Sequence, residues 1–164
     1  VAIAKFTHSG SQIIDWTLEG SAAKSRNLYP SFLAFVRESI KDLTDRGQKV
    51  QLEGVLYHLG ENDMSFAPYR KQAAQRLASI VAQSRRDLGL PDLMWFVSQQ
   101  PPTDHKSVNA LDVTQDLERL AAADKRLIHI KAFDLPGQEL KVVITTAGIV
   151  ALGETLASAY LKRR

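Results

Sequence analysis

Cysteine is absent from this chain of 164 residues. Its absence excludes disulfide bonds, thiolate nucleophiles and metal sites built on sulfur. The compartment stays open, because many exported proteins also lack cysteine. Long apolar runs are absent too, since none approaches the roughly 20 residues that a membrane-spanning helix requires. We therefore expect a soluble chain that has no membrane partner.

A strong excess of one charge is also missing. Lys and Arg together number 21 against 18 Asp and Glu, and their one compact run is Lys162-Arg163-Arg164. Such a run favours a solvated helix end over an arm that binds phosphates. We therefore predict that nucleic acid is not a partner.

Three patterns of ligand-binding proteins are lacking as well. There is no glycine-rich phosphate loop, which a nucleotide-binding domain would need. The first apolar run is not followed by the acidic residues of a receiver domain. No histidine and carboxylate share one helix face at the spacing of metal ligands. These absences disfavour an unrelated nucleotide-binding or receiver module and predict no metal site.

What the sequence does contain is an alternation of strand and helix patterns. Short apolar runs at residues 1–6, 50–57, 93–98 and 127–133 are typical of strands. Helix patterns alternate with them, beginning at Pro30, at Pro68, at Asp112 or Thr114, and at Thr145 or Thr146. Right-handed crossovers between such strands give a mainly parallel sheet with helices on both faces, which is a three-layer α/β/α fold. No repeat or linker divides the chain, so we expect residues 1–164 to form one domain.

The most informative segment is the end of the second strand run, where Gly60-Glu61-Asn62-Asp63 follows apolar residues. Ligands of parallel sheets bind at the carboxyl ends of the strands. There the side-chain amide of Asn62 could donate to a developing oxyanion. Alternatively, Asn62 and Asp63 only cap the segment that follows. Spacing alone leaves both interpretations open.

Several motifs stand in a fixed order along the chain: Ala2–Phe6, Ser9-Gly10-Ser11, Ile14-Asp15-Trp16, Gly60–Asp63, Thr146-Ala147-Gly148 and Leu152-Gly153. Their order and spacing resemble the sialate O-acetylesterase-like carbohydrate esterases of the SGNH hydrolase superfamily, over nearly the whole chain. The resemblance implies a flavodoxin-like sheet and the removal of acetyl groups from sugars without a metal or organic cofactor. It also implies a protein of a kind that is often exported.

The resemblance assigns roles to particular residues. Gly10, in the turn Ser9-Gly10-Ser11, matches a backbone oxyanion donor, and Asn62 matches the second donor. Glu61 and Asp63 match the Gly-Glu-x-Asp form that is typical of the sugar esterases. Together with the aromatic face of Trp16, the side chains of Ser9, Ser11, Glu61 and Asp63 are therefore expected to bind the acetylated carbohydrate.

Parts of the family's catalytic machinery have no counterpart in this sequence. The block that holds the nucleophilic serine lies, in the family, upstream of the segment resembling Val1, so we expect the chain to lack its first βα unit. Leu140 and Val143 stand where the family has its Asp-x-x-His pair, and Leu59 replaces a glutamine. Without a histidine a serine would lack its proton acceptor.

The four histidines are the candidates for a substitute base. His8, beside the Ser9–Ser11 turn, is the best placed of them. His58 is expected to border the core, because neighbouring strand residues point to opposite faces. His129 is expected to be a satisfied strand residue, and His105 to be exposed in a proline loop.

Two hypotheses follow. The first is a carbohydrate acetylesterase in which Gly10 and Asn62 stabilise the oxyanion. The alternative is a catalytically inactive descendant that keeps the fold and the cleft to bind a glycan or a protein, which would account for Leu59, Leu140 and Val143.

Overall fold

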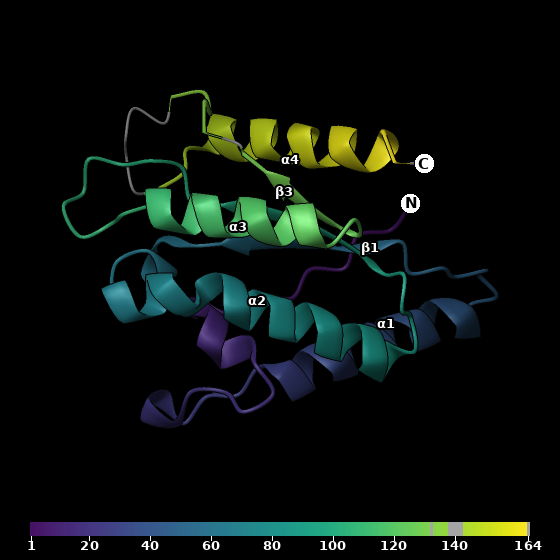
Figure 1. Ribbon diagram of the computed structural model, residues 1–164. Coiled ribbons are helices and arrows are strands. Elements are labelled where there is room, and N and C mark those ends of the chain that lie inside the picture. The colour runs from purple at the N-terminus through teal and green to yellow at the C-terminus, as the bar shows by residue number, and fades with distance from the viewer. Residues whose placement is uncertain (132, 138–142, 164) are drawn as a thin grey trace.

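A three-stranded parallel sheet forms the centre of the molecule (Figure 1). The computed structural model describes residues 1–131, 133–137 and 143–163. Within them the strands are β1 (Gly54–Leu59), β2 (Met94–Gln99) and β3 (Leu127–Ile130), in the order β1-β2-β3. Both pairings are parallel, so the carboxyl ends of the three strands lie at one edge of the sheet.

Four α-helices connect and cover these strands: α1 (Tyr29–Asp45), α2 (Ala67–Leu88), α3 (Leu111–Ala123) and α4 (Thr146–Leu161). Three short 3-10 helices accompany them: η1 (Ile13–Trp16), η2 (Ala22–Lys24) and η3 (Glu61–Asp63). None of the helices within the described ranges is both long and apolar enough to span a membrane.

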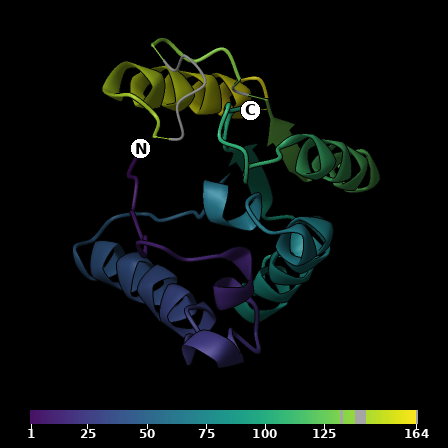
Figure 2. The same ribbon diagram turned by 90° about the vertical axis from the view of Figure 1, so that its left-hand side faces the viewer.

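The helices cover the two faces of the sheet unequally (Figure 2). Side chains of α1, α2, α3 and η1 bury one face in a large apolar cluster around Trp95 and Val97. The other face, with Phe96 and Ile130, packs against α4 through Leu152. Parallel strands joined by helices on both faces confirm the three-layer α/β prediction.

Local sequence signals explain where most helices begin and end. Proline occupies the first turns of α1 and α2, where its missing N–H costs no hydrogen bond. Gly89 ends α2 in the left-handed conformation, with φ of 67°. Thr145 caps α4, because its hydroxyl accepts a hydrogen bond from the N–H of Gly148 at 3.0 Å. Of the two predicted caps, Thr145 or Thr146, the structure has Thr145, and Thr146 is the first residue of the helix.

Two predictions about elements are wrong. Residues 1–6 form no strand, and the side chains of Val1 and Ile3 are exposed instead of buried in the sheet. Helix α3 begins before Asp112 and Thr114, and the side chain of Asn109 accepts from the N–H of Leu111 at 2.9 Å instead. Its oxygen satisfies a donor at the helix start that neither predicted cap reaches.

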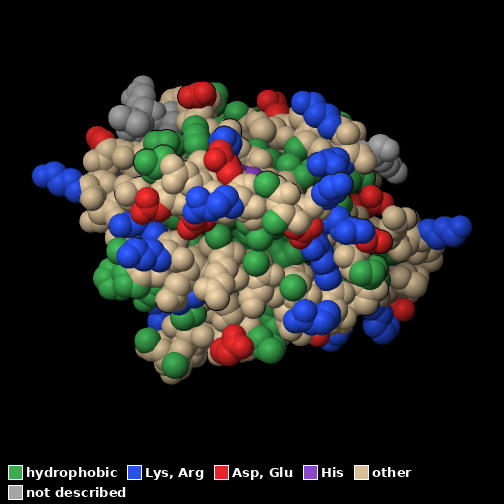
Figure 3. All heavy atoms as spheres, viewed as in Figure 1, with side chains coloured by type: hydrophobic (Ala, Val, Ile, Leu, Met, Phe, Trp, Pro, Cys, Tyr) green, Lys and Arg blue, Asp and Glu red, His purple; other side chains and the backbone are tan. Residues whose placement is uncertain are grey.

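Charges of both signs are interspersed over the face that carries α2 and α3 (Figure 3). Several are paired across elements, as in the contact of 2.6 Å between Nη1 of Arg85 in α2 and Oδ2 of Asp124 after α3. The basic residues on this face therefore do not gather into one patch.

Candidate functional site

The Gly60–Asp63 motif forms a turn of 3-10 helix directly after β1. Gly60 precedes η3 in an extended conformation, and the N–H of Met64 donates to the carbonyl of Glu61 at 3.0 Å to close the turn. Leu59 is fully buried, whereas Glu61 and Asn62 are half-buried. The motif therefore lies at the carboxyl edge of the sheet, where parallel sheets bind ligands.

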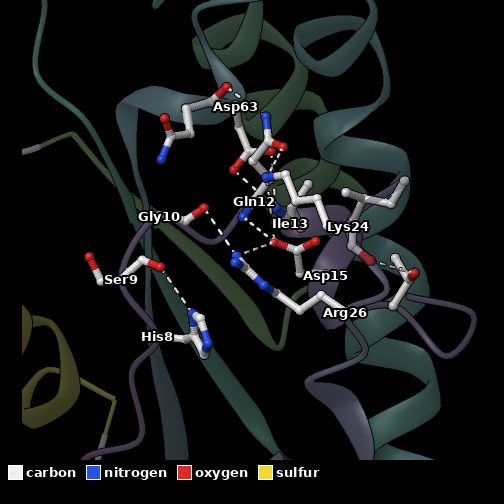
Figure 4. Close-up of polar contacts among 12 residues, drawn as sticks. His8, Ser9, Gly10, Gln12, Ile13, Asp15, Lys24, Arg26 and Asp63 are labelled. Atoms are coloured by element: carbon white, nitrogen blue, oxygen red, sulfur yellow. Dashed lines mark hydrogen bonds and ion pairs between the residues drawn. The ribbon is translucent and has the colours of Figure 1, made fainter. Parts of the chain in front are cut away.

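The loop that contains Gly10 is bound to this turn by hydrogen bonds (Figure 4). The N–H of Ile13 lies 3.0 Å from each carboxylate oxygen of Asp63. The side-chain amide of Gln12 donates to the carbonyl of Asn62 at 3.2 Å. Two motifs 50 residues apart in the sequence thus lie side by side.

The buried carboxylate of Asp15 accepts a hydrogen bond from the same loop. The side chain of Asp15 is fully buried, and its Oδ2 accepts from the N–H of Gln12 at 2.9 Å and from Nη1 of Arg26 at 3.2 Å. Nζ of Lys24 lies 3.8 Å from the same oxygen. Two cations beside a fully buried carboxylate compensate its loss of hydration. Arg26 also donates to the carbonyl of Gly10 at 3.2 Å, so this cluster positions the Ser9–Ser11 turn.

Asp63 is an acid in an environment that disfavours its charge. Asp63 is 2% exposed, and this burial raises its pKa to about 6. The hydrogen bond from the N–H of Ile13 and the positive charge of Arg76 act in the opposite direction and lower the pKa. The side chain therefore changes protonation near neutral pH, while both of its oxygens face the backbone of Ile13.

Gly10 adopts a conformation that favours glycine. Its φ is +65°, in the left-handed region that favours glycine. A Cβ at this position would meet no atom within 4 Å, so the preference for glycine comes from the backbone conformation and not from steric crowding. Within the described residues neither the N–H of Gly10 nor the side-chain amide of Asn62 makes a hydrogen bond. Both groups are thus available as donors to a ligand.

The remaining residues expected at the site lie around this loop. Ser9 is exposed and Ser11 half-buried. His8 is exposed, and its Nδ1 lies 3.0 Å from the carbonyl of Ser9. Trp16 is half-buried and packs edge-to-face against Phe6, with ring centroids 5.6 Å apart.

A groove of about 340 Å³ opens beside the turn. Its lining combines polar and apolar residues: His58, Glu61, Gln100, Val143, Ile144 and Ile149. Val143, where the family resemblance expects histidine, is 78% exposed, and Leu140 lies outside the described residues. The groove joins the carboxyl ends of β1 and β2 to the start of α4.

His58 belongs to this groove, which sequence reasoning did not anticipate. Its Nδ1 lies 2.9 Å from Oγ of Ser98, the residue opposite it in the register of β1 and β2. The alternation of β1 could have placed His58 on the face opposite Tyr57 and Leu59, but the partner strand was unknown from the sequence. Loss of hydration lowers the pKa of His58, and the nearby charge of Glu61 opposes this effect.

The other histidines have different surroundings. Nε2 of His129 lies 2.9 Å from Oε1 of Gln99, but its buried Nδ1 has no hydrogen-bond partner among the described residues, so His129 is only partly the satisfied strand residue that was expected. Burial lowers the pKa of His129 to about 4. His105 is exposed, as predicted. Among the residues that the structure describes, no group of three or more histidine, aspartate or glutamate side chains could hold a metal ion.

The fold defines the class: a three-layer α/β protein with a parallel sheet and a polar turn at the carboxyl edge of that sheet. Residues 1–162 match the family model described as carbohydrate esterase, sialic acid-specific acetylesterase, and the chain belongs to that family. No match was found among the curated proteins.

A comparison with solved structures supports the fold. Among the similar structures is the X-ray structure of an Arabidopsis thaliana protein, which superposes with a TM-score of 0.73 at 23% sequence identity. The match covers 93% of this chain and 57% of the Arabidopsis chain. The chain thus spans little more than half the length of that relative.

Proposed function

We propose that this chain hydrolyses acetyl esters of carbohydrates, with the backbone N–H of Gly10 and the side-chain amide of Asn62 donating hydrogen bonds to the oxyanion. The family match over residues 1–162 supports the ester chemistry and the acetylated sugar as substrate. Donors directed at a developing oxyanion are among the strongest sources of catalysis in ester hydrolysis.

The observation that carries the proposal is the pair of contacts between the two motifs. Gln12 binds the carbonyl of Asn62, and Ile13 binds the carboxylate of Asp63. These hydrogen bonds fix the Gly10 loop against the Asn62 turn before any substrate arrives. Donors that are already in place need no reorganisation when the oxyanion forms.

The substrate contacts belong to the same proposal. The hydroxyls of Ser9 and Ser11 and the carboxylate of Glu61 would bind sugar hydroxyls. The ring of Trp16 would pack against the sugar, and Asp63 would act by holding Ile13. His8 is a candidate base next to the loop. No metal or organic cofactor takes part.

The nucleophilic serine is proposed to come from a further βα unit outside these residues. Two observations support this: the chain spans 57% of the Arabidopsis structure, and within the described residues β1 pairs only with β2. In the isolated 164-residue chain, water takes the place of that serine as the attacking group.

An aryl-acetate assay tests the proposal. We expect the chain to hydrolyse the ester above the buffer rate, and Asn62→Ala to lower kcat by about 100-fold or more, since that is the order of effect of removing one oxyanion donor. Gln115→Ala, an amide on the exposed face of α3, is the matched control and should leave kcat unchanged.

Mass analysis after treatment with a serine-directed fluorophosphonate identifies the attacking group. We expect no stoichiometric label, because water attacks in this chain. A labelled Ser9 or Ser11 would show a serine nucleophile within it. Absence of hydrolysis together with binding of an acetylated sugar would overturn the esterase proposal in favour of a glycan-binding descendant.

A further inference from the structure

The pairing of His58 with Ser98 is built into the sheet. The two residues are opposite each other in the parallel register of β1 and β2, so their side chains leave the same face. Nδ1 of His58 and Oγ of Ser98 are 2.9 Å apart. Ser98 has no exposed surface, whereas His58 is exposed toward the groove. One ring nitrogen is therefore held by the protein, and the rest of the ring is accessible.

The groove around His58 suits a small acyl group. Val143, Ile144 and Ile149 provide an apolar wall, while His58 and Glu61 lie on the side of the Gly60–Asp63 turn. A volume of about 340 Å³ lies near the lower end of the range for ligand pockets. An acetyl methyl group would contact the apolar wall, and the ester oxygens would face the polar side.

The surroundings of His58 favour its action as a general base. Loss of hydration lowers the pKa of His58, so the imidazole is neutral at pH 7 and has a lone pair to offer. The negative charge of Glu61 favours the imidazolium that forms when a proton is taken up. No other charged group that faces the groove opposes it among the described lining residues.

We propose that His58, oriented by Ser98, is the proton acceptor of the ester hydrolysis proposed above, on which this inference rests. Nδ1–H of His58 donates to Oγ of Ser98, and this tautomer leaves the lone pair on Nε2. As water attacks the acetyl carbon, Nε2 takes its proton. The bond from the acyl carbon to the sugar oxygen then breaks, and the imidazolium returns the proton to that oxygen. The products are acetic acid, which ionises to acetate by releasing a proton to solvent, and the sugar with its free hydroxyl.

Ser98 is a positioning residue in this scheme. Its hydroxyl is fully buried, so it cannot reach a substrate as a nucleophile. It fixes the ring orientation and the tautomer of His58, as the partner of a catalytic histidine does elsewhere. A neutral hydroxyl stabilises the imidazolium less than a carboxylate does, so a modest rate is expected.

The remaining histidines are worse placed for this role. Nδ1 of His8 is engaged with a carbonyl of the neighbouring residue on an exposed loop. His129 is opposite Val97 in the register and thus lies on the other face of the sheet, where it contacts Gln99. His105 is in an exposed loop and does not line the groove.

Aryl-acetate kinetics over pH 4 to 9 test the assignment. We expect kcat/KM of the wild type to fall with decreasing pH, with an inflection below the ordinary histidine pKa of 6.5. His58→Gln should lower kcat by about 100-fold and remove this inflection. Ser98→Ala should lower kcat several-fold and change the pH profile, and His105→Gln, the matched control, should behave as the wild type.

Nitrogen NMR of the histidines supplies a second measurement that does not depend on turnover. The His58 signals should show the Nδ1–H tautomer in the wild type and a mixture in Ser98→Ala, and should titrate at the kinetic pKa. If the wild type hydrolyses the ester and His58→Gln does so equally well, or if only His8→Gln abolishes hydrolysis, the assignment of His58 is wrong. The esterase proposal would still hold in both cases. Absence of hydrolysis in the wild type would overturn the esterase proposal and this role with it.

Discussion

Asp63 couples the stability of the site to pH. The residue is 2% exposed and its pKa is raised from 3.8 to about 6, so between these values the folded chain binds more protons than the unfolded chain. Stability from this group is therefore present below pH 4 and is lost as pH rises through about 6. The loss amounts to about 3 kcal/mol, because one pKa unit corresponds to about 1.4 kcal/mol.

Urea unfolding at pH 4 to 8 measures this effect. Other groups titrate as well, so the relevant quantity is the difference between the wild type and Asp63→Asn, which has no proton to lose. We expect the wild type to lose stability relative to Asp63→Asn as pH rises. Asp134→Asn, at an exposed position, is the control. Parallel curves for the wild type and Asp63→Asn would contradict the raised pKa.

At the scale of elements, the same substitution should have opposite effects in a turn and in a helix. Gly10→Ala places a Cβ at φ of +65° and should cost about 1 kcal/mol. Gly153→Ala lies within α4, where a Cβ meets no atom within 4 Å, and should stabilise by roughly 0.5–1 kcal/mol. Thermal unfolding of both variants checks the two signs.

Gly10→Ala also separates stability from chemistry. Alanine keeps the backbone N–H that the proposal uses as an oxyanion donor. Hydrolysis by the folded fraction should therefore fall far less than in Asn62→Ala, which loses its donor. A loss in Gly10→Ala equal to that in Asn62→Ala, with the variant fully folded, would show that the turn geometry controls the site.

The elements that could be predicted from the sequence are those with local signals. Prolines and glycines delimit α1 and α2, and Thr145 caps α4 through its own hydroxyl. The strand expected at residues 1–6 is absent, since an apolar run alone does not determine whether a segment pairs with a neighbouring strand. The capping role of Asn109 was not predicted, because several polar residues near the start of α3 could act as a cap.

The candidate site was predictable in part for the same reason. The Gly60–Asp63 motif is contiguous, so its place after a strand could be inferred from the sequence. Its contacts with Gln12 and Ile13 cross 50 residues and depend on how the loop packs. The proximity of His58 to Ser98 depends on a strand register, which apolar alternation along each strand leaves undetermined.

At the scale of the whole molecule, the open edge of β1 predicts self-association. Within the described residues β1 pairs only with β2, and Leu56 on this strand is 49% exposed. An unpaired strand edge with an apolar side chain offers hydrogen bonds and contact area to another chain. We expect the 164-residue chain to form dimers or larger species as its concentration rises.

Sedimentation velocity over a range of concentrations measures this association. Leu56→Lys places a charge on the edge strand and should shift the chain toward monomer. Leu18→Lys is the matched control, because Leu18 is 53% exposed in a loop outside the sheet. A wild type that stays monomeric at every concentration would show that the edge is protected.

The register of the sheet has a consequence for protein engineering. His58 and Ser98 meet because hydrogen bonds between β1 and β2 set them opposite each other, independently of any loop. Two substitutions at facing positions of adjacent parallel strands could therefore transplant this pair into another α/β scaffold. The recipient's loops would then be free to be redesigned for a different substrate.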